Sequence, residues 1–260
     1  MSALCEIREL EVAYRGNSVP ALTNIDLDIH AGERLAIIGE SGSGKSTLAR
    51  TIARLLPAGA RVRGEMRWSI GQVPLPGRDL GFVFQDPSAS LNPVLTIGEQ
   101  VAEGARRHLG LTWRTAYERA LDMLERVRIP DPAKVLKAFP HQLSGGQRQR
   151  VAIAAALAAG PGILIADEVT SALDMIVQAE IVSLLDELVR EAGMTLIFIT
   201  HDIALASGFA DRVAIFRDGG LVEAGPTGAI LTSPKDVYTR ALLASHRDLS
   251  TPPLIREATS

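Results

Sequence analysis

Residues 39–47 have the sequence Gly-Glu-Ser-Gly-Ser-Gly-Lys-Ser-Thr, which fits the phosphate-loop pattern G-x-x-x-x-G-K-[ST]. An apolar strand expected at 34–38 precedes this segment and a helix expected at 46–56 follows it, which is the context that such a loop requires. The glycines allow backbone N–H groups to turn toward one centre, at the positive end of the helix dipole. The segment therefore predicts a polyphosphate site and not an ordinary glycine turn.

The polar residues of the loop have distinct expected roles. The ammonium group of Lys45 is expected to contact the β- and γ-phosphates, and the hydroxyl of Ser46 to ligate Mg²⁺. The residues of the loop that we expect to bind the nucleotide are Gly39, Ser41, Gly42, Gly44, Lys45, Ser46 and Thr47.

Two acidic residues follow a second apolar strand. The segment Ile-Leu-Ile-Ala at 163–166 ends in Asp167 and Glu168, and two carboxylates at the end of a buried strand are costly unless they have a function. Beside a phosphate loop, we expect Asp167 to hold the water shell of Mg²⁺ and Glu168 to polarise the water that attacks the γ-phosphate. For this segment alone, the alternative is an exposed acidic loop after a core strand.

The composition excludes several classes of protein. The 27 Lys and Arg against 30 Asp and Glu give a net charge of −3, which argues against a protein that holds nucleic acid by a basic surface. A chain with 47% hydrophobic residues is not intrinsically disordered, and a single cysteine, Cys5, excludes an intramolecular disulfide framework and indicates a reducing compartment. The longest charge-free run, 151–166, is shorter than the roughly 20 residues of a membrane-spanning helix. Charges at Glu6 and Arg8 argue against an N-terminal targeting segment.

The spacing of apolar residues predicts an α/β fold. Strands are expected at 4–14, 22–29 (paired with the first), 34–38, 63–70, 80–84, 163–166, 195–200 and 212–216, and helices at 46–56, 95–109, 113–127, 147–159, 176–191 and from Asp202. A block of helices between 91 and 159 interrupts the alternation of strands and helices, which indicates an inserted subdomain. The Ser/Thr/Pro-rich tail 245–260 is expected to be loosely ordered.

The segment Leu143-Ser-Gly-Gly-Gln147, followed by Arg-Gln-Arg, resembles the signature of ATP-binding cassette (ABC) ATPases, and the resemblance extends over about 4–244. It implies a P-loop NTPase core of ABC type, with a mixed and parallel sheet and flanking helices, an N-terminal antiparallel β subdomain and an inserted α-helical subdomain. We expect a single ABC ATP-binding domain over 1–260, with its core at 1–88 and 160–232, the helical subdomain at 89–159 and a C-terminal tail at 233–260.

The resemblance also implies a second phosphate contact. Members of the family form a head-to-tail dimer, in which each ATP lies between the phosphate loop of one subunit and the signature of the other. A hydroxyl and closely approaching N–H groups at a helix N-terminus suit that role. The residues expected to contact the nucleotide of the partner ATPase are Ser144, Gly145, Gly146 and Gln147.

Four further residues match functional positions of the family. Gln85 matches the glutamine that senses Mg²⁺ and the γ-phosphate, and His201 matches the switch histidine. Asp174 matches the loop that crosses the dimer interface, and Tyr14 matches the aromatic residue that stacks on adenine. Taken singly, they have ordinary alternatives: a surface glutamine, a satisfied histidine, a helix-capping aspartate and a packed tyrosine. The expected catalytic residues are Glu168, His201 and Gln85, and the expected metal-binding residues are Ser46, Gln85 and Asp167.

The segment Phe-Gln-Asp-Pro-Ser-Ala-Ser-Leu-Asn-Pro at 84–93 resembles the ATPases of peptide and nickel importers, as do 94–100 and 233–243. These strings could equally be packing features that do not report the substrate. The chain departs from the family at Val169, where proline is usual, and in the short segment 71–79, which predicts a trimmed antiparallel sheet. The absence of a cysteine cluster near the C-terminus favours nickel or metal-chelate importers over peptide importers.

We therefore expect the ATP-hydrolysing subunit of a binding-protein-dependent importer for peptides, nickel or metal chelates, with ATP and Mg²⁺ as cofactors. It is expected on the cytoplasmic face of the inner or plasma membrane as a peripheral protein. The expected partners are a second ATP-binding subunit (a paralogue or a second copy), two transmembrane permease subunits and, indirectly, an extracytoplasmic solute-binding protein, with no nucleic acid. The alternatives are an importer of another solute, a soluble ABC ATPase outside transport, and an inactive nucleotide-binding partner.

Overall fold

The computed structural model describes residues 3–171 and 173–247, and the chain forms two compact units. The first unit comprises the chain up to Val73 together with the chain from Thr195 onward, and the second comprises residues 74–194. The second unit thus contains the expected helical subdomain together with two strands. The boundaries that we expect for this subdomain, 89–159, stay a prediction.

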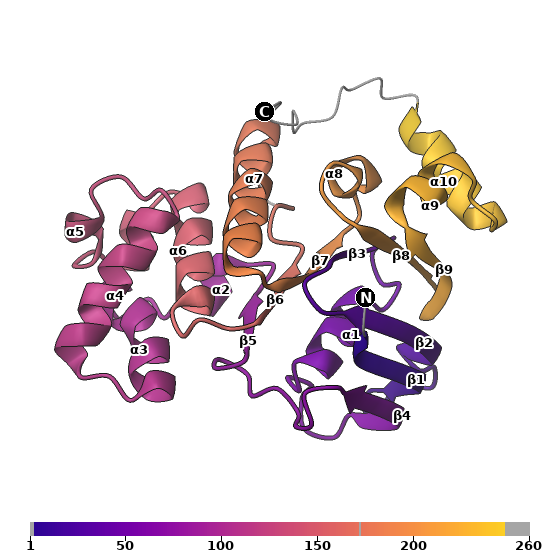
Figure 1. Ribbon diagram of the computed structural model, residues 1–260, viewed down its shortest axis with the longest axis horizontal. Coiled ribbons are helices and arrows are strands. Elements are labelled where there is room, and N and C mark those ends of the chain that lie inside the picture. Colours follow the sequence, from indigo (N-terminus) through magenta and orange to yellow (C-terminus); the bar gives the residue numbers. More distant parts are fainter. Residues whose placement is uncertain (1–2, 172, 248–260) are drawn as a thin grey trace. The chain divides into compact units, whose positions relative to one another are not determined.

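Three antiparallel strands form the N-terminal sheet of the first unit, in the order β2-β1-β4 (Figure 1). They are β1 (Ala3–Ala13), β2 (Leu22–His30) and β4 (Arg61–Trp68). The predicted pairing of the first two strands is confirmed, because Ile7 lies opposite Leu27. Both side chains are buried, whereas Asp26 beside Leu27 is exposed, so the alternation in the sequence separates a core face from a solvent face.

The second set of strands in the first unit runs in the order β7-β3-β8-β9. These strands are β7 (Thr195–Thr200), β3 (Arg34–Gly39), β8 (Arg212–Arg217) and β9 (Gly220–Pro226). β3 pairs in parallel with both β7 and β8, and its residues after Arg34 are all buried, as the apolar run predicts for a central parallel strand. β9 pairs antiparallel to β8. The sequence does not predict β9, because the glycines and the proline of this strand give no alternating pattern.

Four helices belong to the first unit: α1 (Lys45–Ile52), α8 (Ile203–Ser207), α9 (Thr227–Thr232) and α10 (Val237–Arg247). The last three contribute to one apolar core with β3 and β8. The buried residues of this core are Ala36, Ile38, Ile203, Ala206, Ala210, Val213, Ile215, Ile230 and Leu243. Because α10 continues to Arg247, the prediction of a loose tail from Ser245 is wrong for its first residues, and the remainder, 248–260, lies outside the described residues.

The second unit pairs two short parallel strands, β5 (Leu80–Val83) and β6 (Ile163–Asp167). Its helices are α2 (Pro87–Ser90), α3 (Ile97–Leu109), α4 (Trp113–Arg126), α5 (Pro132–Val135), α6 (Gly145–Leu157) and α7 (Met175–Ala192), with a 3₁₀ turn at Pro140–Gln142. Helices α3, α4 and α6 pack against one another (Figure 1). The predicted block of helices is therefore confirmed as a packed bundle.

A capping box sets the start of α3. The Oγ1 of Thr96 accepts a hydrogen bond from the backbone N–H of Glu99 at 3.3 Å, and the Glu99 carboxylate accepts one from the Thr96 backbone at 2.7 Å. The same threonine hydroxyl donates to this carboxylate, and these bonds lower the pKa of Glu99. The helix therefore begins at Ile97, two residues later than the apolar spacing predicts.

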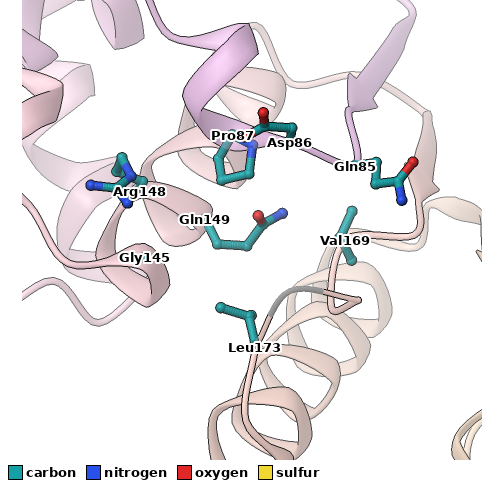
Figure 2. Close-up of a pocket in the computed structure, with 8 residues that line it drawn as sticks. All are labelled: Gln85, Asp86, Pro87, Gly145, Arg148, Gln149, Val169 and Leu173. Atoms are coloured by element: carbon teal, nitrogen blue, oxygen red, sulfur yellow. The ribbon is translucent and has the colours of Figure 1, made fainter.

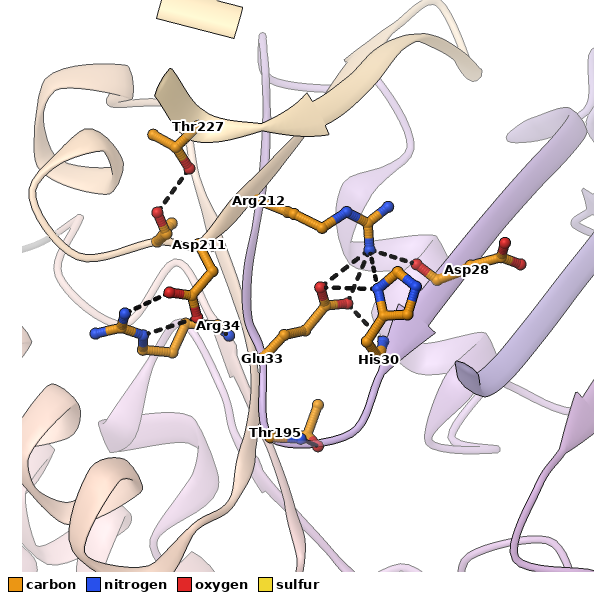
Figure 3. Close-up of polar contacts among 10 residues, drawn as sticks. Asp28, His30, Glu33, Arg34, Thr195, Asp211, Arg212 and Thr227 are labelled. Carbon is orange, nitrogen blue, oxygen red and sulfur yellow. Dashed lines mark hydrogen bonds and ion pairs between the residues drawn. The ribbon is translucent and has the colours of Figure 1, made fainter. Parts of the chain in front are cut away.

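A charge network around the buried Glu33 joins β2, β8 and the residue before β3 (Figure 3). Glu33, just before β3, is 1% exposed, and its carboxylate contacts Arg212 of β8 at 3.0 Å. The same guanidinium donates to the carbonyl oxygen of Asp28 at 2.9 Å and lies 2.7 Å from Nδ1 of His30, both on β2. Burial of Glu33 is tolerated because the carboxylate is paired and also accepts the backbone N–H of His30 at 2.6 Å.

We predict that Arg212→Ala strongly destabilises the protein. Removing the guanidinium leaves the Glu33 carboxylate buried without its counter-charge, which costs about 3–5 kcal/mol of unfolding free energy. Denaturant unfolding of the purified chain measures this loss. The matched control is Arg67→Ala, which removes an ion pair with Glu65 whose side chains are 70% and 60% exposed, and about 1 kcal/mol or less is expected there. Equal losses in the two variants would contradict the prediction.

Candidate functional site

The phosphate loop follows the buried end of β3 and leads into α1. Two of its glycines have no room for a side chain: a Cβ on Gly39 would lie 2.2 Å from the carbonyl oxygen of Phe216, and one on Gly44 would lie 2.7 Å from that of Ala21. Gly44 is also the N-cap of α1, with a φ of 97° that favours glycine. Close packing against β8 and a left-handed backbone together explain the glycine pattern.

The lysine of the loop is held inside it. Lys45 is 3% exposed, and its Nζ donates hydrogen bonds to the carbonyl oxygens of Gly39 and Glu40, each at 2.8 Å. A buried ammonium needs such acceptors, because desolvation of an unpaired charge is costly. The loop therefore surrounds a positive charge at the N-terminus of a helix, and this arrangement suits an anionic polyphosphate.

The remaining expected contacts of the phosphate loop, and Tyr14, lie in the same unit. Ser41 and Gly42 are exposed at the tip of the loop, whereas Ser46 and Thr47 are half-buried in the first turn of α1. Tyr14 follows β1, and its hydroxyl lies 3.1 Å from Oγ1 of Thr47. The structure thus brings Tyr14 to the phosphate loop, and its expected stacking on adenine stays a prediction.

His201 lies at the same edge of the sheet as the start of the loop. It directly follows β7, and the register of the parallel pair places Ile38 opposite Thr200. The next residues, Gly39 and His201, therefore leave neighbouring strands at their carboxyl ends, where open α/β sheets bind their ligands. The imidazole is exposed, so it can be reached by a ligand.

The carboxylate pair lies in the second unit, at the end of β6. Asp167 is 1% exposed, and Glu168 is half-buried with a φ of 47°, which is uncommon for a residue other than glycine. Gln85 follows the neighbouring strand β5, and its Nε2 donates to Oε2 of Glu168 at 3.0 Å. Two residues that we expect to be catalytic are therefore in direct contact, beside the ends of two parallel strands.

The signature segment forms the start of α6. Oγ of Ser144 accepts the backbone N–H of Gln147 at 3.3 Å, and the Ser144 N–H donates to Oε1 of Gln147 at 2.9 Å. Because this cap lies at Ser144, the helix begins at Gly145, two residues earlier than predicted. Gly145 and Gly146 thus stand in the first turn of the helix, where backbone N–H groups face outward without an intrahelical acceptor.

Asp174 caps α7. Its Oδ1 accepts the backbone N–H groups of Ile176 and Val177 at 3.1 and 3.0 Å, which is the helix-capping role that the sequence left open as an alternative. The two residues after it, Met175 and Ile176, are each 74% exposed.

A small cavity of about 130 Å³ lies in the second unit (Figure 2). It is lined by Gln85, Asp86, Pro87, Gly145, Arg148, Gln149, Val169 and Leu173. Gln149 is 1% exposed, and its side-chain nitrogen has no hydrogen-bond partner within the part of the chain that the structure describes. No motif in the sequence predicts a functional role for Gln149. The one feature that could indicate such a role is its position directly after the signature segment. Val169, which stands where proline was expected, is buried in the wall of the cavity.

The donor atoms of the expected magnesium ligands suit that ion. Ser46 offers a hydroxyl, Gln85 an amide and Asp167 a carboxylate, and Mg²⁺ prefers hard oxygen ligands. Among residues 3–171 and 173–247, no cluster of three or more His, Cys, Asp or Glu side chains could hold a metal ion. Within the same residues, every helix is too short or too polar to span a membrane.

Comparison with known proteins decides the family. The model of the family described as ABC transporter matches residues 22–171. A putative peptide import ATP-binding protein of Brucella melitensis is 45% identical over 258 residues, which cover 95% of this chain and 78% of the relative. The chain belongs to the ABC transporter family. As a member, it is an ATP-binding ATPase, and the resemblance that its signature indicated is confirmed.

Two further comparisons agree with this assignment. The oligopeptide transport ATP-binding protein OppD of Bacillus subtilis is 42% identical over 94% of this chain and 72% of the relative. A solved ATP-binding cassette, a dimer in a post-hydrolysis state with ADP and phosphate bound, matches with a TM-score of 0.75 and 33% identity over 86% of this chain and 98% of that chain. The predicted fold class, an ABC-type P-loop ATPase, is confirmed.

We predict that Gly39→Ala destabilises the phosphate loop. The added Cβ would lie 2.2 Å from the backbone oxygen of Phe216, so the loop or β8 must shift, at about 1–3 kcal/mol of unfolding free energy. The matched control is Gly228→Ala in α9, whose Cβ meets no atom within 4 Å and which should be neutral or slightly stabilising. Denaturant unfolding compares the two variants. A Gly39→Ala variant as stable as the control would show that the close approach is unimportant.

Proposed function

We propose that this chain is the ATP-hydrolysing subunit of an ABC importer whose transported solutes are peptides. The observation that carries the hydrolytic part is the 3.0 Å hydrogen bond between Gln85 and Glu168 at the end of two parallel strands. The names of the two relatives, peptide import and oligopeptide transport, support the substrate class. They weigh against the preference for nickel or metal chelates that we based on the missing cysteine cluster.

In this proposal, the phosphate loop binds and Glu168 activates water. The loop presents N–H groups and the buried Lys45 ammonium, which neutralise the β- and γ-phosphates. Glu168 accepts a proton from the attacking water, and Gln85 holds this carboxylate in position through its amide N–H. His201, exposed at the end of β7, is assigned to the γ-phosphate as a hydrogen-bond donor. Tyr14 is assigned to the adenine.

Magnesium would be held by Ser46, Gln85 and Asp167. When bound, it supplies positive charge that offsets the charge developing on the phosphate oxygens. Asp167 is fixed for this role by its buried place at the end of β6.

The proposed partner at the signature is a second ATP-binding subunit. Ser144, Gly145, Gly146 and Gln147 form the outward-facing start of α6, and Asp174 with the exposed Met175 and Ile176 supplies an apolar surface. We propose that these residues meet the nucleotide and the surface of the other ATPase. The further proposed partners are two permease subunits and, through them, a solute-binding protein, so the chain would be peripheral on the cytoplasmic face of the membrane.

We predict that Glu168→Gln slows ATP hydrolysis by at least about 100-fold while ATP binding remains, because the variant loses the general base and keeps the phosphate loop. Steady-state phosphate release and equilibrium binding of a fluorescent ATP analogue measure the two effects. The contrasting variant is Lys45→Ala, which should lose ATP binding itself. Measurable hydrolysis that is unchanged in Glu168→Gln would refute the assignment of the base, whereas no hydrolysis in either the wild type or the variant would favour an inactive nucleotide-binding partner.

The substrate class is tested in proteoliposomes that hold this chain with its permease and binding protein. Under the proposal, ATP hydrolysis rises when peptides are added and does not respond to nickel or to metal chelates. Stimulation by nickel alone, or by another solute, would overturn the substrate class without affecting the ATPase assignment. ATPase activity indifferent to permease and binding protein would instead favour a soluble ABC ATPase outside transport.

A further inference from the structure

The segment 233–243, which the proposed function leaves without a role, docks the start of α10 onto β9. The Glu223 carboxylate of β9 accepts the backbone N–H groups of Lys235 and Asp236 at 2.9 and 3.2 Å. Asp236 in turn accepts the backbone N–H of Tyr238 at 2.7 Å through its own side chain. These bonds fix the backbone at Tyr238, so the direction of its side chain is determined by the fold.

The side chain of Tyr238 reaches the phosphate loop. Its hydroxyl donates a hydrogen bond to Oε1 of Glu40 at 3.2 Å, and the guanidinium of Arg217 lies over its ring, 4.8 Å from the centroid. Partial burial and the nearby Glu40 carboxylate raise the pKa of Tyr238, so the phenol stays protonated at neutral pH. It therefore remains a hydrogen-bond donor under all ordinary conditions.

Glu40 is a carboxylate within a loop that binds anions. It lies between Gly39 and Ser41, and its backbone carbonyl is one of the two that hold the Lys45 ammonium at 2.8 Å. Like charges repel one another, so a carboxylate free to rotate here would oppose the binding of a polyphosphate. The hydrogen bond from Tyr238 restrains this carboxylate and spreads part of its charge onto the phenol.

We propose that Tyr238 is a positioning residue for nucleotide binding, which holds the Glu40 side chain away from the phosphates and thereby lets the loop accept ATP. The inference rests on the proposed function of residues 39–47 as the ATP site. It assigns the C-terminal helix α10 a task in the ATPase cycle, through a contact entirely within the first unit. A tyrosine that only packed against Arg217 would have no such dependence on the charge of Glu40.

A double-mutant cycle on the full chain tests the proposal. The affinity for Mg-ATP is measured by equilibrium binding for the wild type, Tyr238→Phe, Glu40→Gln and the double variant. Tyr238→Phe should weaken binding by about three- to tenfold, which is the range for losing one ordinary hydrogen bond, because Glu40 is exposed to solvent. In the Glu40→Gln background, where no carboxylate remains to be restrained, the same change should alter the affinity by less than about twofold.

Two further readouts separate positioning from packing. Tyr238→Phe should raise KM for ATP and leave kcat unchanged, and the rise in KM should shrink at high salt, because repulsion between exposed charges is screened. Tyr117→Phe on α4 is the matched control, since it removes a phenol hydroxyl from the second unit without touching the loop. Thermal unfolding of each variant checks that the fold is intact.

The outcomes distinguish the inference from the proposed function. Equal weakening in both Glu40 backgrounds, or no weakening in either, overturns the role of Tyr238 while ATP binding by the wild type upholds the site. If Lys45→Ala binds ATP as tightly as the wild type, the phosphate loop is not the nucleotide site, and both conclusions fall. A kcat effect at constant KM also overturns the inference.

Discussion

The close approach of the phosphate loop to β8 constrains the geometry of the first unit. Gly39 ends β3 so close to the backbone of Phe216 that no side chain fits between them, and β3 is buried between its two parallel neighbours. Because the strand cannot shift, the direction in which the loop leaves the sheet is fixed. The positions of Lys45 and of the first turn of α1 follow from that direction, and His201 leaves the adjacent strand at the same edge.

Most of the strands, most of the helices and the phosphate loop can be predicted from short local patterns in the sequence. The phosphate loop is predicted from its glycine spacing. The strands before the loop and before Asp167 are predicted from their apolar runs, and both signals are local in the sequence. The helix expected at 147–159 begins at Gly145 in the structure, because the Ser144 cap starts it there despite the low helical propensity of the two glycines. A Ser followed three residues later by Gln is a capping signal in the sequence, and it indicates the helix start at Gly145.

Other features depend on contacts that the sequence does not reveal. The ion pair between Glu33 and Arg212 joins residues 179 positions apart, and neither residue belongs to a motif. Strand β9 is stable because β8 offers a free edge, and not because of its own composition. In the sequence, nothing separates Gln149 from the other polar residues of its helix. Its burial beside the cavity is what distinguishes it in the structure. Such features require the three-dimensional arrangement.

The lysine of the phosphate loop has a consequence for nucleotide exchange. Its ammonium donates hydrogen bonds to two carbonyl oxygens of its own loop. These internal hydrogen bonds help to fix the conformation of the loop. At the proposed ATP site, an incoming polyphosphate would exchange one set of hydrogen-bond acceptors of Lys45 for another and would not have to order a disordered segment, which lowers the entropic cost of association. Preorganisation of the loop is thus a property of its own backbone, set by the carbonyl oxygens of Gly39 and Glu40.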